Sequence, residues 1–391
     1  MHVIRVMSLI TFLLSSTCAM SDKSPVQHRG TLKHLRTKID SGSEVHVAFL
    51  GGSITQNSKG HTAMVPEWFR QEFPKARFKF TNAGMSSTCS TSGAFRLKDH
   101  IWSQGAPDLL IVEFAVNDDQ DAAHARRECI RGMEGIVRQT LSLNPNAGIV
   151  MVHFVNPGML EMTLKGKTPT SISAHESVAN HYQITSVNVA LEVAQATQQG
   201  RYGWKEYGGT HPKKFGYRAA SDLIIKAIQA GLASDNATTT KLPPLVDPRS
   251  YHSAGFVSVK NATTGKGWKR GRATRELIPH GSIRRDYLPY PLLRGEGPNE
   301  SAKLEFTGRT VGAFILAGPD AGVVESRIDH GKWVEQDLFH RFSEKLNYPR
   351  SVIFHSNLTP GVHTLELRVL DSNRENSKGS AINILHFEVN Q

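Results

Sequence analysis

Cysteine is scarce in this protein. Three cysteines occur among 391 residues, and one of them, Cys18, lies close to the N-terminus. So few cysteines exclude the small disulfide-dense folds. The other two, Cys89 and Cys129, are compatible with one disulfide and equally with two buried thiols. Paired cysteines and His-x-x-His clusters of the zinc-binding kind do not occur, so the sequence predicts no metal site.

Long apolar runs are missing too, apart from one at the start of the chain. The first residues, MHVIRVMSLITFLLSSTCAMS, contain Arg5, an apolar core and then small residues. This pattern predicts a signal peptide over residues 1–19, cleaved after Ala19. A lipoprotein signal centred on Cys18 is less favoured, because Thr17 is bulkier than the usual preceding residue. We therefore expect a secreted or periplasmic protein without a stable membrane-inserted segment.

Acidic residues are outnumbered by basic ones. The chain has 46 Lys and Arg against 35 Asp and Glu, a formal net charge of +11. This charge favours an anionic partner, such as an acidic polysaccharide, and is equally compatible with a solvated basic surface. A nucleic-acid partner is not expected, because no basic helix concentrates the charge and the chain is predicted to be exported.

Strand-like and helix-like segments alternate over residues 28–233. Short apolar strands separated by helical periodicity predict a parallel sheet covered by helices on both faces. In such sheets ligands bind at the carboxyl ends of the strands. The expected strands are 45–50, 77–82, 108–114 and 148–155, and the expected helices are 64–73, 129–141, 175–194 and 215–232.

The composition changes after residue 233. Residues 234–248, SDNATTTKLPPLVDP, have the character of a linker. Beyond them the apolar period becomes two, at 304–308, 311–318, 363–370 and 382–390. This pattern predicts a second domain over residues 249–391, an antiparallel β-sandwich.

Ser53 follows the first expected strand in the stretch FLGGSIT, residues 49–55. Two glycines allow a tight turn and a close approach of a second group, which suits an exposed nucleophile as well as a plain turn. An acyl-transfer enzyme also needs a base for the hydroxyl and donors for the oxyanion.

Three further residues are candidates for these roles. Gly84 in TNAGMSST and Asn117 in VEFAVND each follow an expected strand, and His211 in THPKKFG precedes the last helix. Taken singly, each has a structural explanation as a turn, cap or packing residue. Taken together, their order places all of them at one edge of the same sheet.

The blocks GGSIT, NAG, VND and THP resemble the four motifs of the SGNH hydrolases, a branch of the GDSL-type esterases and lipases. The resemblance covers residues 45–232 and is closest to exported carbohydrate esterases with an added β-sandwich. It implies a flavodoxin-like three-layer domain followed by a jelly-roll-like sandwich. It also implies Ser53 as nucleophile and His211 as base, with an oxyanion hole formed by Ser53, Gly84 and Asn117, and no cofactor.

Two positions depart from the family pattern. Gly52 stands where many relatives have Asp, and Gly208 stands where the family usually has the Asp that orients the histidine. A Ser–His dyad would then operate, or another acid would serve. Glu206 is the nearest acid in sequence, and Glu113, Asp118 and Asp119 lie near the oxyanion strand.

The resemblance and the motifs together predict an exported serine esterase that removes O-acetyl groups from a polysaccharide. The alternatives are a lipid esterase or thioesterase using the same site, and a glycan-binding protein with an impaired site. Arg96 is expected in a structural ion pair rather than at an acidic substrate group.

Overall fold

The computed structural model describes residues 23–235, 241–288, 290–298 and 301–391. The expected signal peptide, residues 1–19, lies outside this range, as does the middle of the expected linker.

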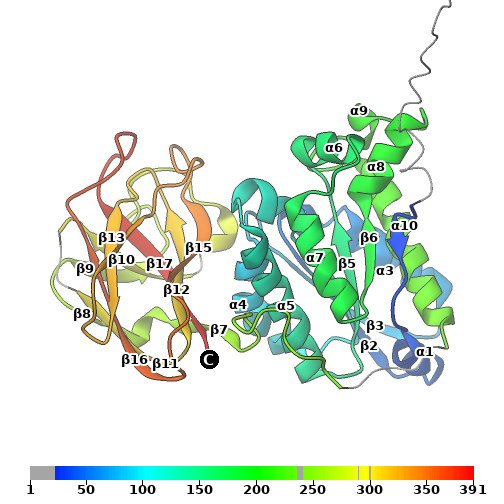
Figure 1. Ribbon diagram of the computed structural model, residues 1–391, viewed down its shortest axis with the longest axis horizontal. Coiled ribbons are helices and arrows are strands. Elements are labelled where there is room, and N and C mark those ends of the chain that lie inside the picture. The colour runs from blue at the N-terminus through cyan, green and yellow to red at the C-terminus, as the bar shows by residue number, and fades with distance from the viewer. Residues whose placement is uncertain (1–22, 236–240, 289, 299–300) are drawn as a thin grey trace, which may run out of the picture.

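An α/β sheet forms the first part of the chain (Figure 1). Its strand order is β1-β6-β5-β4-β2-β3, in which β2 to β6 are parallel and β1 is antiparallel to β6. The strands are β1 (Val26–Gln27), β2 (Glu44–Gly51), β3 (Arg77–Gly84), β4 (Leu109–Glu113), β5 (Gly148–His153) and β6 (Thr185–Asn188). The register sets Gly51 beside both Gly84 and Glu113, so three strands end together at one edge.

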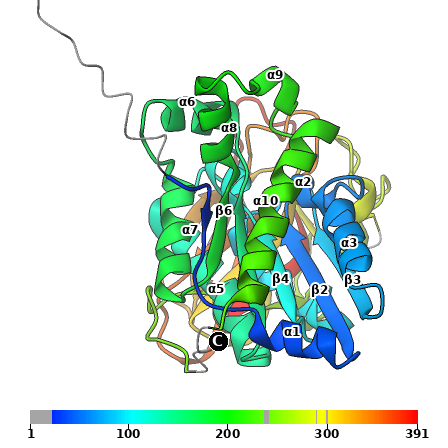
Figure 2. The same ribbon diagram turned by 90° about the vertical axis from the view of Figure 1, so that its right-hand side faces the viewer.

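Helices cover both faces of this sheet, as its apolar strands require. One face packs on α1 (Lys33–Asp40), α3 (His61–Glu72), α8 (Val189–Gln198) and α10 (Lys214–Ala233), which face the viewer in Figure 2. The other packs on α4 (Ser90–His100), α5 (Arg126–Leu143) and α7 (Thr170–His181). Three short helices lie toward the carboxyl ends of the strands: α2 (Ser53–Gln56), α6 (Pro157–Leu164) and α9 (Trp204–Tyr207).

The expected helix over residues 175–194 is wrong. The structure has α7 up to His181, then β6 from Thr185 to Asn188, and then α8. The segment Thr185–Asn188 is buried in the sheet between β1 and β5. Sheet pairing thus overrides the apolar periodicity, which runs without a break through both helices.

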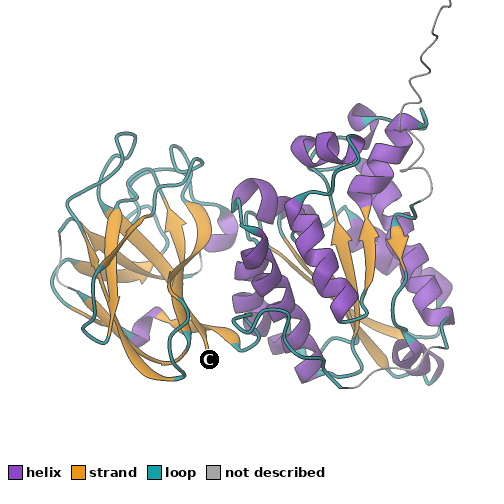
Figure 3. Cartoon of the chain, viewed as in Figure 1, coloured by secondary structure: helices purple, strands orange, loops and turns teal. Residues whose placement is uncertain are grey.

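Two antiparallel sheets form the second part of the chain (Figure 3). One sheet has the order β15-β12-β17-β10-β9, with β7 pairing to β17, and the other has β14-β13-β16-β11-β8. A shared apolar core lies between them, as expected for a sandwich. The strands are β7 (Ala254–Ser258), β8 (Thr263–Thr264), β9 (Trp268–Arg272), β10 (Pro291–Glu296), β11 (Ala302–Gly308), β12 (Thr310–Ala317), β13 (Val323–Ile328), β14 (Val334–Asp337), β15 (Tyr348–His355), β16 (Gly361–Val369) and β17 (Ala381–Asn390).

The sandwich packs against the side of the α/β sheet that carries α4 and α5 (Figure 1). Met85, just after β3, belongs to a buried apolar cluster that otherwise consists of sandwich residues, including Phe314. The Tyr287 hydroxyl donates to the Ser86 carbonyl oxygen at 2.8 Å. The two parts therefore meet close to the carboxyl ends of β2 and β3. Within the described chain, no helix combines the length and apolarity needed to cross a membrane.

Candidate active site

Ser53 and His211 meet at the carboxyl edge of the parallel sheet. Ser53 is the first residue of α2, directly after β2. Its Oγ lies 2.7 Å from His211 Nε2, within hydrogen-bond distance. His211 lies on the loop between α9 and α10, and its ring is exposed. The two residues are 158 positions apart in the chain, so only the fold brings them together.

A buried carboxylate supports the turn before Ser53. Glu113 Oε1 accepts the Gly52 N–H at 3.0 Å and the Thr55 hydroxyl at 2.7 Å. Burial raises the Glu113 pKa to about 7, although these two hydrogen bonds oppose the rise. Glu113 therefore holds Gly52 and Thr55, the residues that flank the nucleophile turn, by hydrogen bonds.

No carboxylate hydrogen-bonds to the His211 ring in the described part of the chain. Glu206 is exposed and accepts the Gly203 N–H at 2.9 Å, which caps α9. The other three candidate acids have partners elsewhere. Glu113 bonds to the nucleophile turn, Asp118 to Ser90 Oγ at 2.7 Å and Asp119 to Asn156 Nδ2 at 2.8 Å.

Gly208 is required by the backbone at the position where the family usually has Asp. It ends α9 in the left-handed region, at φ +106°. A Cβ there would lie 2.4 Å from the Lys213 backbone nitrogen. An aspartate could not be placed at this position without moving the start of α10.

The expected oxyanion donors lie around Ser53. A Cβ on Gly84 would lie 2.2 Å from the Gln56 backbone nitrogen, so β3 ends directly against α2. The Gly84 N–H donates to Asn82 Oδ1 at 2.9 Å. The Ser53 N–H, at the first helical position, has no acceptor within α2.

The Asn117 side chain lies beside the nucleophile turn and is buried. A Cβ on Gly52 would lie 2.1 Å from Asn117 Oδ1, which explains why this chain has glycine before the serine. Asn117 Nδ2 donates to Asp121 Oδ2 at 2.5 Å. This bond uses one of the two amide hydrogens and leaves the other.

Arg96 corrects an expectation, because its side chain is in no ion pair among the described residues. It is fully buried, and it donates to the carbonyl oxygens of Gly51 at 2.8 Å and Ala83 at 2.7 Å. The guanidinium thus links the ends of β2 and β3 by hydrogen bonds. Ser53 follows the end of β2, and Gly84 is the last residue of β3. The apolar periodicity of the α4 sequence does not predict that Arg96 would bind these carbonyl oxygens.

A parallel α/β sheet with a serine and a histidine paired at its carboxyl edge is the arrangement found in serine hydrolases. Residues 49–219 match the GDSL-like Lipase/Acylhydrolase family. This match covers most of the α/β part of the chain and includes all four predicted site residues.

Similar solved structures extend the likeness to both parts of the chain. A two-domain esterase (CEX) active on acetylated mannans has 21% identity, with 93% of this chain and 96% of that chain covered, at a TM-score of 0.72. It was solved with mannopentaose, and a second structure of the same esterase gives a TM-score of 0.71 at 21% identity and the same coverage. This similarity shows a shared two-part fold. A search of curated proteins finds no match.

Proposed function

We propose that this protein is an exported esterase that removes acetyl groups from a polysaccharide through an acyl-enzyme on Ser53. The single observation that carries the proposal is the 2.7 Å approach of Ser53 Oγ to His211 Nε2. The match of residues 49–219 to an acylhydrolase family supports it.

In the first half of the reaction, His211 Nε2 accepts the Ser53 hydroxyl proton as Oγ attacks the ester carbonyl carbon. The oxyanion is stabilised by the N–H groups of Ser53 and Gly84 and by the second amide hydrogen of Asn117. Substrate oxygen replaces Asn82 Oδ1 as the acceptor for Gly84, because catalytic hydrogen bonds tighten only when substrate binds.

In the second half, the imidazolium returns its proton to the sugar oxygen, and the alcohol leaves. Water, deprotonated by His211, then attacks the acyl-Ser53 carbonyl carbon, and acetate departs as Oγ regains a proton. His211 works here without an orienting carboxylate. A Ser–His dyad retains the nucleophile, the base and the oxyanion hole.

The polysaccharide substrate is supported by the second part of the chain. Asp286, from the sandwich, accepts a hydrogen bond from Gln56 Nε2 at 2.6 Å, three positions after Ser53. Sandwich residues therefore reach the helix that carries the nucleophile, so a bound glycan would contact both domains. The similar two-domain esterase acts on acetylated mannans. The net charge of +11 favours a chain with acidic groups.

The test is acetate release from a panel of acetylated polysaccharides by the mature protein. We expect Ser53→Ala to lower kcat at least about a thousandfold, because the nucleophile is lost. Ser58→Ala is the control, since Ser58 is exposed on the same segment and should retain activity.

Three outcomes would contradict the proposal. Equal acetate release by wild type and Ser53→Ala would exclude Ser53 as nucleophile. Glycan binding without acetate release would indicate an impaired binding protein. Turnover of long-chain acyl esters alone would indicate a lipid esterase.

A further inference from the structure

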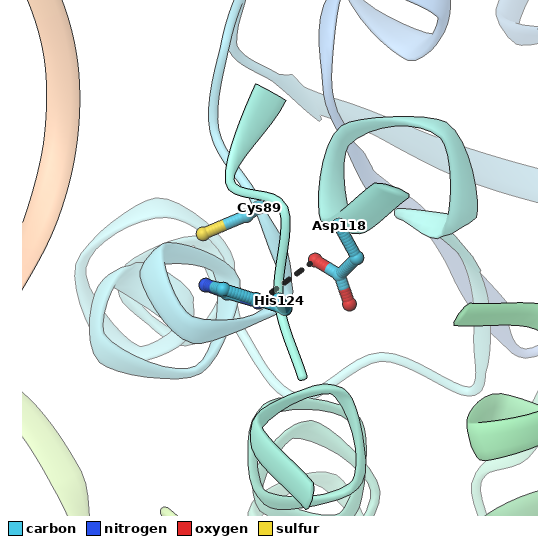
Figure 4. Close-up of side chains that lie close together, drawn as sticks. All are labelled: Cys89, Asp118 and His124. Carbon is cyan, nitrogen blue, oxygen red and sulfur yellow. Dashed lines mark ion pairs between the residues drawn. The ribbon is translucent and has the colours of Figure 1, made fainter. Parts of the chain in front are cut away.

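The side chains of Cys89, Asp118 and His124 lie close together (Figure 4). One donor atom from each, Sγ, a carboxylate oxygen and a ring nitrogen, lies within 4.8 Å of the other two. We propose that these three side chains bind a divalent metal ion, and that zinc is the ion they fit. Thiolate, imidazole and carboxylate are the ligand types that zinc combines in proteins.

The separation of two donors fits an ion between them better than a direct bond. His124 Nδ1 and Asp118 Oδ1 form an ion-pair contact at 3.6 Å (Figure 4), which is too long for a hydrogen bond. Two ligands at about 2.1 Å from a tetrahedral zinc are about 3.4 Å apart. His124 Nδ1 is buried and has no hydrogen-bond partner in the described chain. A bound ion would give this nitrogen a direct ligand bond in place of the long ion-pair contact with Asp118.

The carboxylate is already oriented as metal ligands usually are. Asp118 accepts the Ser90 N–H at 2.8 Å and the Ser90 hydroxyl at 2.7 Å. It also lies 2.9 Å from His175 Nε2, and both Asp118 and His175 are fully buried. Outer partners of this kind fix the direction of a ligating oxygen.

The thiol of Cys89 lies at the start of a helix, beside the other two donors. Cys89 is the N-cap of α4, an 11-residue helix, and its Sγ is 3.3 Å from Ser92 Oγ.

The two loops that supply the donors are held in unusual conformations. Ser87 has φ +64° and Ala123 has φ +48°, close to Cys89 and His124 respectively. The His124 N–H donates to the Asp118 carbonyl oxygen at 2.8 Å, which closes the second loop on itself. Non-glycine residues with positive φ cost free energy and persist where the surroundings enforce them, as a bound ion would.

An ion here would act on the site as well as on stability. Asp118 follows Asn117 directly, so the ion would tie the oxyanion segment to α4. The binding itself does not depend on the proposed esterase function, because none of its three ligands has a role in that reaction. The positions 89, 118 and 124 form no short recurrent spacing, which is why the sequence predicts no metal.

The experiment measures metal binding by the untagged full-length mature protein after removal of metal with a chelator. We expect about one Zn²⁺ per chain, a higher thermal midpoint with Zn²⁺, and a thiolate-to-metal charge-transfer band with Co²⁺. Cys89→Ser should abolish the band, and His124→Gln should weaken Zn²⁺ binding at least about 100-fold, since even outer partners are worth 10- to 100-fold.

Cys129→Ser is the matched control. Cys129 is equally buried, and its Sγ lies 3.9 Å from the His124 carbonyl oxygen, but it is outside the donor group. The control should keep both the metal and the band. The proposal is overturned by a wild type that binds neither ion, or by a Cys89→Ser variant that binds Zn²⁺ as tightly as wild type. Absence of free thiol in the denatured wild type would indicate a Cys89–Cys129 disulfide and overturn it as well.

Discussion

At the scale of single residues, the histidine of the proposed dyad has no carboxylate partner among the residues that the structure describes. Every nearby carboxylate that the sequence offers is engaged elsewhere, and Glu206 caps α9 instead. His211 therefore depends on its loop and on Ser53 for its orientation. A dyad of this kind is less efficient than a triad but still catalytic.

We predict that Glu206→Gln leaves kcat within about twofold of wild type across the pH range of activity. Glutamine at the third helical position also accepts the Gly203 N–H, so the cap is retained. Initial rates on an acetyl ester at several pH values test this. A tenfold or greater loss of kcat in Glu206→Gln that Glu206→Asp does not show would instead identify this carboxylate as the orienting acid.

Glu113 makes stability depend on pH. Its pKa is raised from 4.5 to about 7 by burial, so the native state favours the protonated form. The resulting stabilisation is present below pH 4.5 and is lost as the pH rises to 7. We predict that Glu113→Gln, which cannot ionise, gains up to about 3 kcal/mol in unfolding free energy relative to wild type over this interval.

Urea unfolding of both proteins at pH 4.5, 5.5, 7 and 8 measures this difference. The difference should level off above pH 7. A difference between the two proteins that is the same at all four pH values would contradict the prediction. Glu206→Gln is the control, because Glu206 is exposed and its pKa is lowered by the Gly203 N–H rather than raised.

At the scale of elements, the site is built where the ends of three strands touch. Gly51 of β2 pairs with Gly84 of β3 and with Glu113 of β4. Arg96, from α4, then joins the carbonyl oxygens at the ends of β2 and β3. Because Gly51 and Gly84 have no Cβ, the ends of β2 and β3 approach neighbouring atoms more closely than any other residue would allow.

We predict that Gly52→Ala lowers kcat about 100-fold or more while KM changes little. The added methyl would displace the Asn117 amide, from which it would be 2.1 Å away, and removal of one oxyanion donor costs about 10²- to 10³-fold. Gly158→Ala is the control, because its Cβ would have only ordinary contacts, the nearest at 3.5 Å. Unchanged kcat in Gly52→Ala would remove Asn117 from the oxyanion hole.

At the scale of the whole molecule, the sandwich completes the surroundings of the site. His340 Nε2 lies 2.9 Å from the Asp121 carbonyl oxygen, and Asp121 in turn holds the Asn117 amide. Tyr251, which precedes β7, packs in the α/β core. The two parts thus share buried side chains as well as polar contacts.

We predict that the two parts unfold in one transition. The apolar clusters that they share would be exposed if either part unfolded alone, which raises the free-energy cost of separate unfolding. Differential scanning calorimetry of the mature protein should give equal calorimetric and van't Hoff enthalpies. Two resolved transitions would show that the domains, taken as residues 28–233 and 249–391, are independent.

Much of the fold was predictable because its signals are local. Buried strands such as β2 and β5 read as apolar runs, and α10 shows helical periodicity. The strand β6 was missed, because four residues between two helices carry too little pattern. The sandwich strands β7 to β10 and β13 to β15 were also missed; in β9 and β14, for example, exposed residues interrupt the apolar alternation.

The site was predictable only in part. Ser53, Gly84, Asn117 and His211 each follow or precede a recognisable element, and the motif order brings them to one edge. The roles of Arg96 and Glu113 could not be foreseen, because they depend on which backbone atoms each buried side chain reaches. The same holds for the group formed by Cys89, Asp118 and His124.

By itself the sequence determined the two-part architecture, and it predicted the sheet edge at which we propose that the chemistry occurs. These follow from apolar periodicity and from motifs that lie within a few residues of strand ends. Only the tertiary structure decided that Gly208 excludes an aspartate, that Glu206 is a cap and that Arg96 clamps two strands. Each of these depends on distances between atoms far apart in the chain, and such distances exist only once the core has packed.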